Sequence, residues 1–206
     1  MEINIEIARR VLETVDAGLV KGVGKAIPGQ MCVEVAVNYA MGLPHGDNPS
    51  CVAPALRAFT IRLNDANWSS NAARAAGMRR LSLVQLGSAE HFDHAEFRRR
   101  IVKWAISTCV PFALRAAASV QKDAKHKAAL LNHAAICERD GTCDAAVNAK
   151  KAAAYAADSA AYAADAVDAR DKSLARFAED AVQILIEMNV PGVQWLILAP
   201  VEASNA

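Results

Sequence analysis

The chain has 206 residues, of which 53% are hydrophobic and 5% aromatic, and its formal net charge is +1. This length and apolar content are sufficient for a packed core and exclude an intrinsically disordered chain. Alanine supplies much of the apolar content, which favours close-packed helices over sheets. We therefore predict an all-α protein: a single multi-helix bundle of about eight helices over residues 1–206, alanine-rich in its C-terminal half, with a subdivision into 1–120 and 121–206 as the alternative.

Targeting and redox signals are absent from the sequence. No basic N-terminus leads into an apolar signal core, and the longest charge-free stretch, Met188–Val201, is short and contains Pro191. The five cysteines are odd in number and lie mostly within helical patterns, which disfavours a disulfide framework. We expect a cytoplasmic protein with free thiols and no membrane segment.

The N-terminal part predicts two helices separated by a glycine-rich loop. Apolar residues from Ile5 to Leu19 recur every three or four positions, as on one face of a helix, and the run Gly18–Gly29 ends it. Met31–Met41 reads as a second helix that is apolar except for Glu34 and Asn38, one turn apart. Such a helix is normally buried, so Glu34 needs a partner, and we expect Arg57 or Arg62 in that role.

Four further helices follow from apolar periodicity and caps. Ser50 can cap a third helix that runs to about Leu63, and Ser69 or Ser70 a fourth that ends at Gly87. A fifth helix has a buried face that carries Phe97 and Phe112, and it is kinked at Pro111. A sixth spans about Asp123–Arg139.

The C-terminal part is dominated by alanine, which supplies 17 of the 39 residues from Cys143 to Ala181. Tyr155 and Tyr162, seven residues apart, share one side of this helical stretch and are a candidate surface for self-association into a homo-oligomer. An amphipathic stripe from Leu174 to Met188 comes next, and the tail Val193–Leu198 is expected to dock on the core.

Charge is unevenly distributed along the chain. Residues 71–130 carry 11 basic and 4 acidic groups, whereas residues 131–206 carry 6 basic and 11 acidic ones. Two interpretations are open: basic and acidic helices pair with each other, or the middle segment binds an anion.

An anion site would need two or three arginines that converge on a pocket. Duplex nucleic acid is not favoured, because aromatic residues are few and the total charge is near zero. A small anionic ligand such as a nucleotide signal is compatible with this composition. The candidate binding residues, together with Glu34, are Arg57, Arg62, Arg74, Arg79, Arg80 and Arg99.

One set of residues is compatible with catalysis. Cys32 lies at an expected helix N-terminus, which favours a thiolate, and His45 with Asp47 in the following loop could act as its base. The opposing interpretation is that Cys32 is a small core residue, since no known nucleophile signature surrounds it.

Two histidine clusters are candidate metal sites. His91 and His94 lie beside Asp93, and His133 precedes Cys137 and Cys143. Neither cluster offers four ligands at tight spacing, so we predict no metal and no cofactor.

Four segments carry a resemblance to known proteins: Pro28–Glu34, Leu43–Asp47, Ile61–Asp65 and Asn71–Arg80. In these segments the chain resembles a group of uncharacterised bacteriophage and prophage proteins. Its helical layout also resembles small helical immunity proteins that pair with bacterial toxins. The phage resemblance implies an accessory protein that is made in an infected bacterium and binds a host factor, including components of antiviral defence.

Three hypotheses follow. The first is a non-enzymatic, phage-type binding protein that blocks a host protein or sequesters an anionic signal. The second is a cysteine-dependent hydrolase or transferase that uses Cys32, His45 and Asp47. The third is a self-associating structural protein.

Overall fold

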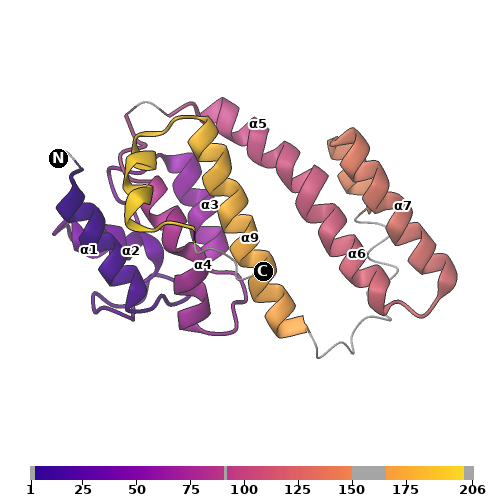
Figure 1. Cartoon of the computed structure of the whole chain (residues 1–206), viewed down its shortest axis with the longest axis horizontal. Helices are drawn as coiled ribbons and strands as arrows, with labels where there is room; N and C mark the ends of the chain where they lie inside the picture. Colours follow the sequence, from indigo (N-terminus) through magenta and orange to yellow (C-terminus); the bar gives the residue numbers. More distant parts are fainter. Residues whose placement is uncertain (1–2, 91, 150–165, 202–206) are drawn as a thin grey trace. The chain divides into compact units, whose positions relative to one another are not determined.

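The protein is all-α, as predicted. The computed structural model describes residues 3–90, 92–149 and 166–201, and within these ranges it contains nine helices and no strands (Figure 1). His91 and the predicted association surface around Tyr155 and Tyr162 lie outside the described residues.

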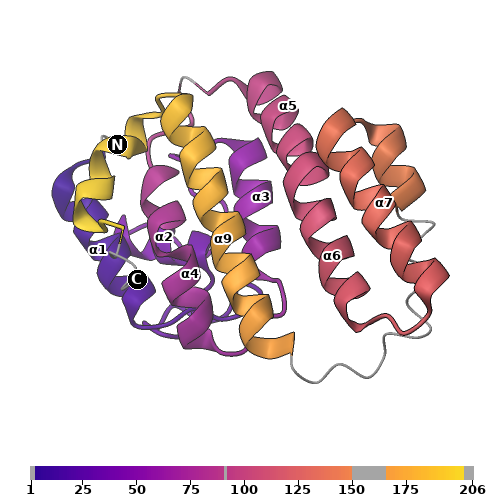
Figure 2. The same ribbon diagram turned by 45° about the vertical axis from the view of Figure 1, so that its right-hand side comes forward.

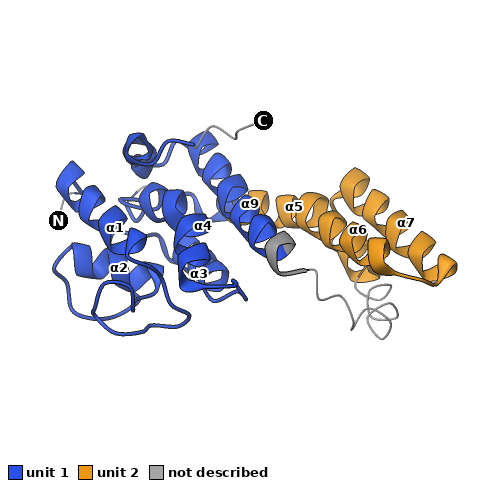
Figure 3. Ribbon diagram, turned by 60° about the horizontal axis from the view of Figure 1, so that its bottom comes forward, with its two compact units in different colours: residues 1–97, 167–206 blue, residues 98–166 orange. Residues whose placement is uncertain are grey.

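The chain forms two compact units (Figure 3). Unit 1 comprises residues 1–97 and 167–206, and unit 2 comprises residues 98–166. Residues on both sides of position 120 belong to unit 2, so the units do not correspond to a division at that position.

Unit 1 is built from helices whose apolar faces pack on one another. Asn4 caps the first helix by accepting a hydrogen bond from the Ile7 amide at 3.0 Å, and the predicted apolar stripe of that helix is buried. Helices α4 and α9 lie side by side in both views, and their ion pair Arg80–Glu179 joins them (Figures 1 and 2). The elements are α1 (Ile5–Asp16), α2 (Val33–Ala40), α3 (Pro54–Asn64), α4 (Asn71–Val84), α9 (Ala166–Glu187) and the 3-10 helix η2 (Pro191–Leu198).

Helix α3 begins later than its sequence suggests. Ser70 caps α4 as predicted, through a 3.0 Å hydrogen bond from the Ala73 amide, but the N-cap residue of α3 is Ala53 and not Ser50. The reason is tertiary: the Ala53 amide donates to Ser88 Oγ at 2.9 Å. This bond fastens the segment before α3 to the loop that follows α4.

The C-terminal segment docks on the core of unit 1, as its apolar composition predicted. Gly192 is buried, and a Cβ built on it would lie 2.2 Å from the carbonyl oxygen of Val84. Arg80 Nη1 also donates to the carbonyl of Ala199 at 2.6 Å. The 3-10 helix η2 is therefore held directly against the C-terminal end of α4.

Unit 2 is a smaller helical hairpin with its own core. Asp123 caps α7, and Gly141 ends it in the left-handed conformation at φ 59°, in agreement with the predicted span. The core is formed by Ile106, Leu114, Leu130, Cys137 and several alanines. The elements are α5 (His94–Trp104), which begins in unit 1, the π-helical segment η1 (Ala105–Cys109), α6 (Val110–Val120), α7 (Ala124–Asp140) and a helix over 143–149.

The predicted distortion at Pro111 takes the form of the π-helical segment η1 just before it. Proline lacks an amide hydrogen and its ring clashes with the carbonyl four residues earlier, so the turn widens. The wider turn rotates the residues that follow it, and Phe112 is 38% exposed. Its prediction as a buried residue was therefore wrong.

The continuous helical stretch His94–Val120 meets the length and composition of a membrane-spanning helix. Core helices of globular proteins can have the same length and composition.

Candidate functional site

Cys32 occupies the helix N-terminus that the sequence predicted, since it is the N-cap residue of α2. It is only 4% exposed. Burial raises the pKa of its thiol to about 11, and the backbone amides of Val35 and Glu34 oppose this rise only in part. At neutral pH the Cys32 thiol is therefore protonated, which is the property of a core cysteine and not of an activated nucleophile.

The predicted base is not assembled around Cys32. His45 is exposed in the loop after α2, and no hydrogen bond or ion pair among the described residues links it to Cys32 or Asp47. The loop is held by Asn38 Nδ2, which donates to the carbonyl of Gly46 at 2.7 Å. Asp47 is near enough to raise the pKa of Cys32, an effect opposite to activation.

Thiol labelling tests this description. In the native protein at neutral pH, we expect iodoacetamide to modify Cys32 roughly a hundredfold more slowly than in the urea-unfolded chain, because a pKa near 11 in place of 9.0 reduces the thiolate fraction by about that factor. Cys143, which is exposed, serves as the internal control. Site-resolved mass spectrometry measures both rates, and equal Cys32 rates in the two states would contradict its burial.

Glu34 is a buried carboxyl group without a hydrogen bond. It is 0% exposed, and neither side-chain oxygen has a hydrogen-bond partner among the described residues. Burial raises the pKa of Glu34 to about 8; the nearby charge of Arg57 lowers it and that of Asp47 raises it further. Arg57 is thus the nearby cation expected from the sequence, although the two form no direct ion pair, while Arg62 is exposed.

Arg74 is a structural residue. Its side chain is 6% exposed and donates to the carbonyl of Asn64 at 2.8 Å, to the carbonyl of Leu19 at 2.9 Å and to Asn71 Oδ1 at 2.9 Å. These bonds join the loop after α1, the end of α3 and the start of α4. A guanidinium committed to three acceptors in the interior is not available to a ligand.

Removal of this guanidinium is expected to weaken the fold. Arg74→Met keeps the volume but leaves two buried carbonyls without a donor, so we expect a loss of about 3 kcal/mol in the free energy of unfolding. Arg62→Met, at an exposed position of the preceding helix, is the matched control and should change it by less than about 0.5 kcal/mol. Urea denaturation measures both, and similar values for the two variants would contradict the structural role.

The candidate arginines Arg79 and Arg80 of unit 1 are each engaged in an ion pair. Arg79 pairs with Asp16 through two hydrogen bonds of 2.8 and 3.1 Å, and Arg80 pairs with Glu179. Arg99 is exposed on α5 in unit 2. Within unit 1, these contacts correspond to the interpretation in which basic and acidic helices pair with each other.

The described residues bring no histidine, cysteine, aspartate and glutamate side chains together as a metal site. His133, Cys137 and Cys143 form no such group. The cluster that contained His91 falls partly outside the described residues.

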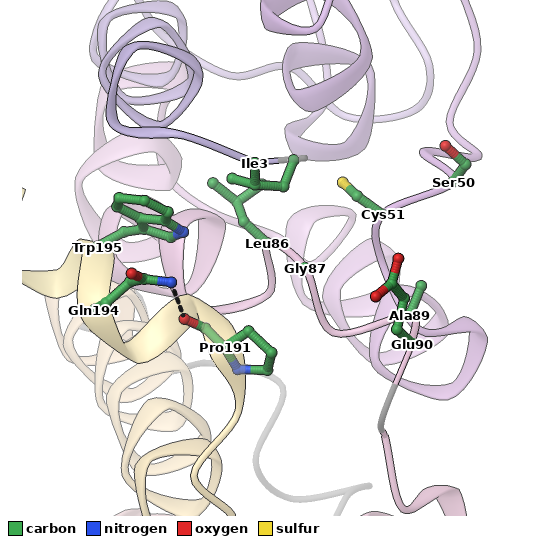
Figure 4. A pocket seen from close by; sticks show the side chains of 10 residues that line it. All are labelled: Ile3, Ser50, Cys51, Leu86, Gly87, Ala89, Glu90, Pro191, Gln194 and Trp195. Carbon is green, nitrogen blue, oxygen red and sulfur yellow. Dashed lines mark hydrogen bonds between the residues drawn. The ribbon is translucent and has the colours of Figure 1, made fainter. Parts of the chain in front are cut away.

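Unit 1 contains a cavity of about 470 Å³ (Figure 4). Four segments that are distant in sequence form it: the segment before α1, the segment before α3, the loop after α4 and η2. The hydrogen bonds Ala53 N to Ser88 Oγ and Ala89 N to the Cys51 carbonyl position two of these segments. The lining residues are Ile3, Ser50, Cys51, Leu86, Gly87, Ala89, Glu90, Pro191, Gln194 and Trp195.

Polar and apolar side chains are mixed around the cavity: Gln194 lies beside Trp195, and Glu90 lies beside Ala89 (Figure 4). Figure 4 shows Trp195 across from Glu90, with Leu86 and Gly87 between them. Glu90 is the one charged side chain among the described residues of the lining. The Cys51 thiol, whose pKa is raised by burial and by the nearby Glu34, is neutral at pH 7 and contacts the Met41 sulfur at 3.5 Å.

Two exposed apolar side chains follow lining residues closely in the sequence. In a 3-10 helix residues three apart share a face, so Ile197 lies one turn beyond the lining residue Gln194. Ile197 is 79% exposed, and Ile5, two residues after the lining residue Ile3, is 40% exposed.

Sequence reasoning missed this site because no local motif marks it. The sequence signal was limited to the prediction that the apolar tail docks on the core. No protein-family model, curated protein or solved structure matches the chain.

Proposed function

We propose that this protein is a non-enzymatic binding protein of the phage accessory type, which acts in the cytoplasm of a bacterial host by blocking a host protein. The observation that carries the proposal is the unit 1 cavity, together with the exposed apolar side chains of Ile5 and Ile197, which follow its lining residues Ile3 and Gln194 in the sequence. A concave site beside exposed large apolar side chains is typical of a surface that a partner covers. The resemblance to phage proteins supplies the host context, including antiviral defence.

A protein partner is better supported than a sequestered anionic signal. Arg74, Arg79 and Arg80 are engaged in contacts within unit 1. Among the described residues that line the cavity, one is acidic and none is a lysine, arginine or histidine.

The two other hypotheses have less support in the described residues. A cysteine-dependent enzyme requires a thiolate and a base, whereas Cys32 is buried with a raised pKa, and no hydrogen bond among the described residues joins His45 to it. Self-association through Tyr155 and Tyr162 concerns residues outside the described part of the chain.

Affinity capture tests the proposal. We expect the wild-type chain, expressed in the bacterial host, to enrich one host protein in quantitative mass spectrometry, and Trp195→Ala to reduce that enrichment by at least about tenfold, as is typical of an aromatic anchor. Ile27→Ser is the matched control, since Ile27 is 49% exposed and does not line the cavity. Equal enrichment by Trp195→Ala and wild type, or no enriched protein, would exclude this binding site.

A further inference from the structure

We infer that a proton on Glu34 latches the loop after α2, residues 42–48, onto that helix. In this latch the neutral carboxyl group of Glu34 donates a hydrogen bond to Asn38 Oδ1, and Asn38 Nδ2 donates to the carbonyl of Gly46. Such a latch is independent of the binding function proposed for the cavity.

The amide group of Asn38 already forms the second bond of this latch. Its Nδ2 donates to the carbonyl of Gly46 at 2.7 Å, and this bond fixes the direction in which the amide group points. The Oδ1 atom therefore faces away from Gly46, where it is buried without a hydrogen-bond partner among the described residues. A buried amide oxygen needs a donor, because the loss of its contact with water is otherwise not compensated.

Glu34 is placed to supply this donor. It precedes Asn38 by four residues, so the two side chains are neighbours on one face of α2. Both oxygens of the Glu34 carboxyl group are also buried and have no hydrogen-bond partner among the described residues. Two acceptors cannot pair with each other, but a protonated carboxyl group has one O–H donor. One proton on Glu34 therefore provides the hydrogen bond that Asn38 Oδ1 lacks.

The groups around Glu34 set the pH at which the latch opens. Burial raises the pKa of Glu34 to about 8; the charge of Arg57 on α3 lowers it, and that of Asp47 in the latched loop raises it. The charge of Glu34 in turn raises the pKa of the Cys32 and Cys51 thiols. Helices α1 and α4 also pack on α2, but none of their titratable groups shifts the pKa of Glu34.

Loss of the proton above pH 8 removes the latch. An ionised Glu34 cannot donate to Asn38 Oδ1, and its charge repels the carboxylate of Asp47 in the loop. The lost hydrogen bond and the repulsion act in the same direction, because both separate residues 42–48 from α2. Below pH 8 the neutral carboxyl group holds the loop in place.

Carbon-13 NMR of the full chain between pH 6 and pH 10 tests the latch. We expect the Cδ signal of Glu34 and the Cα signal of Gly46 to titrate together, with a midpoint near pH 8. Relaxation at the Gly46 Cα should give an order parameter of about 0.85 at pH 6.5 and below about 0.6 at pH 9.5. The effect of His45 on its neighbour Gly46 is measured in Glu34→Gln and subtracted.

Two substitutions of Glu34 separate the donor from the charge. Glu34→Gln is neutral and keeps a donor for Asn38 Oδ1, so Gly46 should stay rigid from pH 6.5 to pH 9.5. Glu34→Met is also neutral and of similar size but has no donor. In that variant Gly46 should be as mobile at pH 6.5 as in the wild type at pH 9.5. Glu13→Gln, at an exposed carboxylate of α1, is the control and should titrate like the wild type.

Three results would overturn the latch. The first is a wild-type loop whose mobility does not change with pH. The second is a Glu34→Met loop as rigid as that of Glu34→Gln, which would mean that a buried water or another group pairs Asn38 Oδ1. The third is a Glu34→Gln loop that opens above pH 8 as in the wild type. None of these measurements depends on a host partner, so failure of the latch and failure of the proposed function are distinguishable.

Discussion

Glu34→Gln is expected to make the protein more stable than the wild type at neutral pH, by about 3 kcal/mol at pH 7. A substitution that removes a charge from the core of a helical protein usually has a cost, because it breaks a pair. Here the carboxyl group is fully buried and has no hydrogen-bond partner among the described residues. Its neutral form is the one that the fold accommodates.

The sign follows from the raised pKa. Glu34 has a pKa of about 8 in the folded protein and 4.5 in an unfolded chain. Between these values the folded protein holds a proton that the unfolded chain has released, so stability falls by about 1.4 kcal/mol for each pH unit. Below pH 4.5 and above pH 8 the contribution of Glu34 is constant. Glutamine stays neutral throughout and removes this dependence.

Urea denaturation between pH 4 and pH 9 measures the effect. The stability difference between Glu34→Gln and the wild type should grow from pH 4.5 to pH 8 and then level off. Glu13→Gln, which changes an exposed carboxylate of α1, should show no such growth. Parallel pH profiles for Glu34→Gln and the wild type would contradict the description of Glu34 as a buried neutral acid.

Gly192→Ala is expected to destabilise unit 1 by about 2–4 kcal/mol and to open the cavity. The added methyl group would lie 2.2 Å from the Val84 carbonyl oxygen and 2.6 Å from its carbon. Because these are backbone atoms of Val84, the last residue of α4, no side-chain rotation can relieve the contact. The helix η2, which carries Pro191, Gln194 and Trp195, must move away.

The control for this variant is Gly46→Ala. A Cβ at Gly46 meets no atom within 4 Å, and that glycine does not adopt a positive φ. Chemical denaturation should therefore separate the two variants by at least about 2 kcal/mol. The NMR signal of the Trp195 indole should also shift in Gly192→Ala and stay in place in Gly46→Ala. Equal stability of the two variants would show that η2 is not packed as described.

The distribution of charge could be read from the sequence, but the pairing of the charges could not. The sequence revealed that residues 71–130 are basic and residues 131–206 acidic. It left open whether the arginines bind a ligand or pair internally. The contacts of Arg79 with Asp16 and of Arg80 with Glu179 join residues more than 60 positions apart, which no local pattern predicts.

The sequence alone determined the helical class, most helix ends and the position of Cys32 at a helix N-terminus, because helix periodicity and capping depend on residues within one or two turns. Because these signals are local, they failed where other parts of the structure changed a helix, as at the start of α3 and at Phe112. Ser50 is a reasonable cap by type, but the hydrogen bond of Ala53 with Ser88 moved the start of α3. Phe112 follows the apolar period of a regular helix, and the π-helical turn before Pro111 changed its direction.

Tertiary structure alone decided the chemistry of the candidate sites. Cys32 and Glu34 were both found in the sequence as unusual residues, but their protonation depends on how completely other segments remove them from water. The cavity is formed by segments that lie far apart in the sequence, from Ile3 to Trp195, and Glu90 belongs to a site only because these segments meet in the folded protein. Helices follow from neighbours along the chain, whereas burial, charge pairing and cavities follow from neighbours in space.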